Sequence, residues 1–130
     1  MSTRAVNLAK WFVTLWFTIG GLGHFVAADF FVRITPAWVP HPLEVVWLSG
    51  ALELAGAAGL WSRALRRWAA GGLFLLTLAV SPANIEMALH PEQFPEFPVA
   101  LLYLRLLLQV GLLAAIAVVW RQASHSASRA

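Results

Sequence analysis

Four long apolar segments dominate this chain, and they restrict what it can fold into. A helix needs about 20 mostly apolar residues to cross the hydrocarbon core of a bilayer. Segments of this character cover residues 10–30, 44–61, 68–89 and 98–120. Prolines and charged residues occupy the stretches between them, and clustered prolines break helices. The pattern therefore predicts an all-α protein with four membrane-spanning helices.

The composition excludes several other classes of protein. The chain is 60% hydrophobic and 12% charged, whereas soluble domains are about 45–50% apolar and about 25% charged. It contains no cysteine, so redox work would need a bound cofactor or a partner. The net charge is +3, but the basic residues form no face interleaved with aromatic residues. We therefore expect the lipid bilayer, and no nucleic acid, as a partner.

The positions of the basic residues predict the orientation of the helices. Lys and Arg in short loops favour the cytoplasmic side of a membrane. The N-terminus, the second loop and the C-terminal tail contain Arg4, Lys10, Arg63, Arg66, Arg67, Arg121 and Arg129. We therefore expect an integral membrane four-helix bundle of antiparallel, up-down topology with cytoplasmic N- and C-termini. Residues 1–121 form this single domain, and residues 122–130 are expected to be a disordered cytoplasmic tail.

Six polar residues interrupt the apolar segments. An ionisable group at membrane depth costs a few kcal/mol unless it is paired or hydrated, so it suggests a functional site. A rise of about 1.5 Å per residue puts these residues at overlapping depths in the outer half of the membrane. The candidate site residues are His24, Ser49, Glu53, Asn84, Arg105 and Gln109.

The simplest arrangement is an ion pair between Glu53 and Arg105, with His24, Asn84 and Gln109 completing hydrogen bonds. This network either locks the helices together or lines a polar pocket, open toward the outer face, for a small ligand. Interhelical polar contacts contribute about 0.6–2 kcal/mol each, which suits a purely architectural role as well. No spacing supplies the ligands of a metal site, and no nucleophile–base arrangement is present. We therefore expect no metal and no catalytic activity of the chain on its own.

Four short motifs resemble those of the DoxX-like family of small bacterial membrane proteins. They are Gly23-His24-Phe25, residues 49–54 (SGALEL), residues 82–88 (PANIEMA) and residues 104–109 (LRLLLQ). The resemblance covers about residues 10–120. It implies a multi-pass protein of the bacterial inner membrane, linked to quinone-dependent redox complexes. Because it lacks cysteine, the chain departs from the redox-active relatives that relay thiols.

Three functions follow from these observations. The first is an accessory or ligand-binding subunit of a membrane redox complex, or a homo-oligomer, with a quinone as the candidate cofactor. Quinone carbonyls need hydrogen-bond donors in apolar walls, and the polar cluster supplies them. The second is a small transporter or proton-coupled carrier in which Glu53 titrates. The third is a purely structural subunit of a larger membrane complex.

Overall fold

The computed structural model describes residues 1–129, and over that range the protein is helical without a strand. Its elements are α1 (Thr3–Val26), α2 (Ala28–Ile34), α3 (Pro42–Gly59), α4 (Arg66–Leu89), the 3-10 helix η1 (Pro91–Gln93) and α5 (Val99–Ser128). The predicted all-α class is therefore confirmed. Helices α1, α4 and α5 are long and apolar enough to cross a membrane.

Helix α3 is not among these three candidates, although the sequence predicted a span at 44–61. It has 18 residues, which correspond to a length of about 27 Å, slightly less than the hydrocarbon core. It also contains two carboxylates, Glu44 and Glu53. Since 18 residues are long enough for a candidate, the two acids, and not the length, account for the absence of α3 from the three.

Two further boundaries differ from the prediction. The segment 10–30 is not one helix, because Ala27 leaves the helical conformation with φ −122° and ψ 40° and separates α1 from α2. At the other end, α5 continues through Ser128, across the segment that was predicted to be disordered. There Ser124 Oγ donates to Trp120 O at 3.0 Å, and Ser126 Oγ donates to Gln122 O at 3.0 Å. These hydroxyls stay within their own helix, so the polar side chains do not interrupt it.

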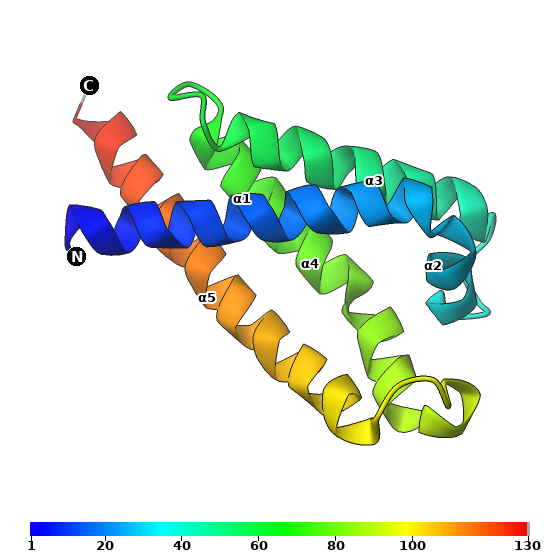
Figure 1. Ribbon diagram of the computed structural model, residues 1–130. Coiled ribbons are helices and arrows are strands. Elements are labelled where there is room, and N and C mark those ends of the chain that lie inside the picture. The colour runs from blue at the N-terminus through cyan, green and yellow to red at the C-terminus, as the bar shows by residue number, and fades with distance from the viewer. Residues whose placement is uncertain (130) are drawn as a thin grey trace.

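Helix α1 lies along α3, and α4 lies along α5 (Figure 1). The two pairs come together near the chain termini and diverge toward α2 and the α4–α5 connection (Figure 1). Glycines allow the close contact of α1 with α3. A Cβ atom added to Gly50 would lie 2.6 Å from Cβ of His24 and 3.0 Å from the carbonyl oxygen of Gly21. A larger residue at position 50 would therefore push the two helices apart.

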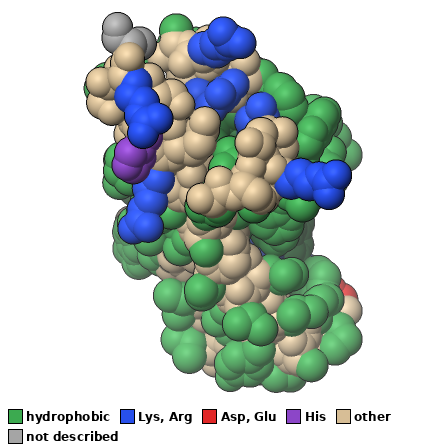
Figure 2. Space-filling view, turned by 90° about the vertical axis from the view of Figure 1, so that its left-hand side faces the viewer, with side chains coloured by type: hydrophobic (Ala, Val, Ile, Leu, Met, Phe, Trp, Pro, Cys, Tyr) green, Lys and Arg blue, Asp and Glu red, His purple; other side chains and the backbone are tan. Residues whose placement is uncertain are grey.

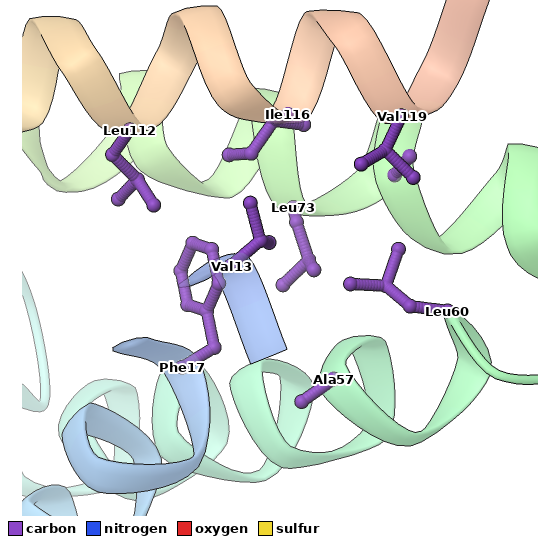
Figure 3. Close-up of a cluster of buried hydrophobic side chains, with 9 residues drawn as sticks. Val13, Phe17, Ala57, Leu60, Leu73, Leu112, Ile116 and Val119 are labelled. Carbon is purple, nitrogen blue, oxygen red and sulfur yellow. The ribbon is translucent and has the colours of Figure 1, made fainter. Parts of the chain in front are cut away.

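Two clusters of buried apolar side chains hold the helices together. The larger one consists of Val13, Phe17, Ala57, Leu60, Ala70, Leu73, Leu112, Ile116 and Val119. Figure 3 shows that its α5 members project toward Leu73, Val13 and Leu60. The second cluster, near the α4–α5 connection, consists of Ile34, Met87, Ala88, Phe94 and Leu102. The candidate site lies between these two clusters.

Candidate functional site

A cavity of about 410 Å³ lies between the two apolar clusters. Its walls come from all five α-helices and the α2–α3 connection. All six residues that the sequence singled out line this central cavity: His24, Ser49, Glu53, Asn84, Arg105 and Gln109. Most of the other lining side chains are apolar, among them Phe17, Ile34 and Leu112. The cavity is thus an apolar space with polar groups on facing walls.

The first polar wall is formed by α1 and α3. His24 is buried, and its Nδ1 atom lies 2.8 Å from the carbonyl oxygen of Val46 and 2.8 Å from Oγ of Ser49. The Ser49 hydroxyl itself donates to the same Val46 oxygen at 2.9 Å. A carbonyl oxygen can only accept, so Nδ1 of His24 carries a hydrogen.

This tautomer determines the chemistry of the other ring nitrogen. Nε2 of His24 lies 3.5 Å from Oε1 of Glu53, and both side chains are buried. A neutral imidazole with its hydrogen on Nδ1 presents a lone pair at Nε2, and an ionised carboxylate offers no donor. A favourable contact therefore needs one proton, either on Nε2 or on the Glu53 carboxyl.

The predicted ion pair between Glu53 and Arg105 is not formed. Within residues 1–129, the ion-pair contact of Glu53 is His24, and Nη1 of Arg105 donates to Sδ of Met87 at 3.1 Å. Helix α3 packs on α1 and α4, and α5 packs on the same two helices. Glu53 and Arg105 therefore project from different walls of the cavity. The prediction paired opposite charges at equal depth, but the sequence alone does not show which helices are neighbours.

The second polar wall joins α4 to α5 through a chain of amides and hydroxyls. Nδ2 of Asn84 donates to Oε1 of Gln109, and Nε2 of Gln109 donates to Oγ of Ser81. Ser81 Oγ in turn donates to the carbonyl oxygen of Thr77 at 2.8 Å. Gln109 is therefore occupied with α4 and not with Glu53 or Arg105. Among the polar residues of this wall, Arg105 has the weakest partner, because a thioether sulfur is a poor acceptor.

Two contributors to the site were not found by sequence reasoning. Met87 was missed because an apolar residue in an apolar segment gives no signal. The carbonyl oxygen of Val46 was missed because a backbone group has no sequence signature. Gly20 has a further role, since a Cβ atom added there would lie 2.9 Å from Oε2 of Glu53. Its lack of a side chain lets the carboxyl lie against α1.

The central cavity reaches the molecular surface. Two of its lining side chains are large, apolar and mostly exposed: Ile19 on α1 at 71% and Trp38 in the α2–α3 connection at 74%. The described part of the chain, residues 1–129, has no group of three or more His, Asp or Glu side chains that could hold a metal ion. The arrangement can donate and accept hydrogen bonds in an apolar space that is open at its rim.

A family model described as a domain of unknown function, DUF8561, matches residues 13–121. Comparison with curated proteins and with solved structures finds no match. The resemblance to the DoxX-like family is therefore wrong, and the redox links that it implied lose their support. Short motifs of small and apolar residues recur among helical membrane proteins, because the bilayer restricts their composition. The match extends over most of the chain, which belongs to the DUF8561 family.

Proposed function

We propose that this protein is a multi-pass membrane protein in which α1, α3, α4 and α5 cross the bilayer as an antiparallel four-helix bundle with cytoplasmic termini. Large apolar side chains are exposed along these helices, for example Leu15 at 54%, Leu75 at 68% and Leu107 at 68%. Apolar patches of this extent are unusual on soluble monomers. Contact with lipid chains accounts for them.

The charge distribution supports this orientation. Every Lys and Arg except Arg33 and Arg105 lies at one end of the molecule. This basic end carries both termini and the α3–α4 loop. Figure 2 looks at this end, and Lys and Arg side chains gather over its upper part above a hydrophobic surface. All the acidic residues lie elsewhere in the chain, at Asp29, Glu44, Glu53, Glu86, Glu92 and Glu96. By the positive-inside rule, the basic end faces the cytoplasm.

Helix α3 fits as the fourth crossing although it is not among the three apolar candidates. Its polar side chains Ser49 and Glu53 are 9% and 6% exposed and line the central cavity. Beyond Glu44 in its first turn, its exposed positions are apolar, with Leu48 at 61% and Leu52 at 49%. A helix that turns its polar groups inward and its leucines outward suits a lipid environment, because unpaired polar groups are costly there.

We infer that the central cavity binds a small amphipathic molecule with a quinone-like head group, which carries two hydrogen-bond acceptors on opposite sides. The observation that carries this proposal is the placement of Arg105, which lines an apolar cavity and, within residues 1–129, forms no ion pair with a carboxylate; Glu53 attracts it only at longer range. The free N–H groups of Arg105 would donate to one carbonyl oxygen. With a proton on its carboxyl, Glu53 on another wall would donate to the second carbonyl oxygen in place of Nε2 of His24.

The rest of the cavity suits the apolar part of such a ligand. Its walls include Trp16, Phe17 and Val80, and small-molecule sites are mostly apolar with a few placed polar groups. The exposed side chains Ile19 and Trp38 mark a rim that would face lipid tails. A hydrophobic ligand would therefore enter from within the bilayer.

A pair of matched substitutions tests this proposal. Ala83 lines the central cavity, whereas Ala114 is exposed on α5 and lies outside it. Decylubiquinone, a quinone with a short apolar chain, should raise the thermal midpoint of the detergent-purified protein and of Ala114→Phe. It should not raise that of Ala83→Phe, because the phenyl ring fills the cavity. An equal rise in both variants, or none in the unsubstituted protein, would overturn the proposal.

A further inference from the structure

A second, smaller cavity lies at the basic end of the molecule, apart from the central cavity. Its volume is about 170 Å³. It is formed by the first turns of α1, the beginning of α4 and a late part of α5. Its lining residues are Met1, Thr3, Val6, Asn7, Lys10, Arg66, Val119 and Gln122.

Two cationic side chains face this cavity without an acidic partner. Lys10 and Arg66 form no ion pair with a carboxylate of residues 1–129. Both are held by the two residues that follow α3, Leu60 and Trp61. Nε of Arg66 donates to the carbonyl oxygen of Leu60 at 2.6 Å, and Nζ of Lys10 lies 4.1 Å from the centre of the Trp61 ring. Two like charges brought together in this way repel each other, and a bound anion would remove that repulsion.

Neutral donors and the helix ends add to this positive environment. The amides of Asn7 and Gln122 and the hydroxyl of Thr3 line the same cavity. Helix α1 begins at Thr3 and α4 begins at Arg66, and neither has an acidic residue in its first turn. The N-terminus of a helix carries a partial positive charge. Two cations, three neutral side chains and two helix ends therefore favour an oxyanion with several acceptor oxygens.

We propose that this basic-end cavity binds the phosphate of an anionic phospholipid head group in the cytoplasmic leaflet. The inference rests on the membrane orientation proposed above. Val6 and Val119 give the cavity apolar sides, and the neighbouring surface exposes Leu8 at 71% and Trp11 at 53%. These side chains offer contacts to the glycerol and acyl chains, which inorganic phosphate lacks. Basic groups at the cytoplasmic surface attract anionic lipids in general; here two of them line a formed cavity.

Native mass spectrometry of the detergent-purified protein, titrated with phosphatidylglycerol or phosphatidylcholine, tests the proposal. The double variant Lys10→Gln/Arg66→Gln should bind phosphatidylglycerol about tenfold more weakly than the unsubstituted protein. The control Arg63→Gln/Arg67→Gln removes the same charge from exposed positions outside the cavity. It should change the affinity by about twofold or less, because exposed charges act weakly through water and salt.

Three results would overturn the proposal. Equal losses in the two double variants would mean that diffuse charge, and not the cavity, attracts the lipid. Equal binding of phosphatidylcholine would show that the anionic head group is not recognised. If the protein binds inorganic phosphate but does not bind phosphatidylglycerol, the ligand of the cavity is an anion from solution. Lys10→Gln/Arg66→Gln should leave the decylubiquinone-induced rise in thermal midpoint unchanged. That measurement therefore distinguishes failure of the lipid proposal from failure of the ligand proposal for the central cavity.

Discussion

Nε2 of His24 lies 3.5 Å from Oε1 of Glu53, so the buried acid of α3 is paired with the histidine of α1. The other ring nitrogen is fixed by the carbonyl oxygen of Val46 and the hydroxyl of Ser49. Because Glu53 is paired with His24, Arg105 on α5 is left with one hydrogen-bond partner within residues 1–129, the sulfur of Met87. The pairing therefore leaves a guanidinium group available to a ligand in the central cavity.

This pairing predicts which residues are energetically coupled. In a double-mutant cycle, His24→Ala and Glu53→Ala should show a coupling free energy of about 0.5–3 kcal/mol, as residues in contact do. The cycle of Glu53→Ala with Arg105→Ala should give a smaller coupling, because these two charges attract each other only from beyond ion-pair distance. Both cycles are measured by reversible unfolding in mixed micelles. A larger coupling for Glu53 with Arg105 would mean that they, and not His24 and Glu53, form the main pair.

The contact of α1 with α3 predicts that alanine substitutions at two glycines have very different effects on the free energy of unfolding. Gly50→Ala should lower the free energy of unfolding by about 1–3 kcal/mol, because the new Cβ atom would meet Cβ of His24 and helices cannot absorb such overpacking freely. Gly72→Ala is the control, since no atom lies within 4 Å of its added Cβ. Alanine favours helix formation, so Gly72→Ala should be neutral or stabilising by up to about 1 kcal/mol. Equal destabilisation by both would contradict the close helix contact.

Arg105 should matter more for ligand affinity than for folding. Arg105→Met should weaken decylubiquinone binding by about tenfold to a hundredfold, the range expected for one hydrogen bond to a charged group. The thermal midpoint of the ligand-free protein should change little, because the thioether of Met87 is a weak partner. Arg33→Met is the matched control, since Arg33 pairs with Glu96 outside the cavity. If both variants weaken binding equally, Arg105 does not contact the ligand.

The absence of native cysteine makes the proposed orientation easy to measure, because each introduced cysteine is unique. Ala64→Cys lies in the α3–α4 loop, and Gln93→Cys lies in η1; both positions are exposed. In intact bacterial spheroplasts, a membrane-impermeant maleimide should label Gln93→Cys and not Ala64→Cys. Lysis should make both react. Labelling of Ala64→Cys before lysis would show that the basic end is not cytoplasmic.

Local signals in the sequence were sufficient for the helical class and insufficient for the pairing of side chains. Apolar runs and prolines predict helices wherever they occur, and the all-α class follows from them. The partner of Glu53 depends on which helices are neighbours and on how each is rotated. Those are long-range properties, set here partly by the contact of Gly21 with Gly50. Opposite charge and equal depth therefore favoured Arg105 as the partner of Glu53, whereas the structure pairs Glu53 with His24.

The helix boundaries also separate features that local sequence predicts from features that depend on the fold. The break at Ala27 carries no proline or glycine, so the apolar segment 10–30 gave no reason to divide it. In the structure, the chain turns there and α2 packs back on α3 and α4, which supplies the contacts that stabilise the break. The six polar residues could be selected because each is conspicuous in an apolar segment. Their separation into a His24–Glu53 wall and an Asn84–Gln109 wall required the fold.

The most direct test of the central claim is whether the central cavity is occupied in the membrane. The protein is released from its native membrane into mild detergent, and native mass spectrometry records the mass of any small molecule that stays bound. We expect one bound amphipathic molecule on the unsubstituted protein and on Ala114→Phe, and its loss from Ala83→Phe. Folded protein that carries no bound molecule in any of the three forms would contradict the account and leave the polar walls as a structural lock.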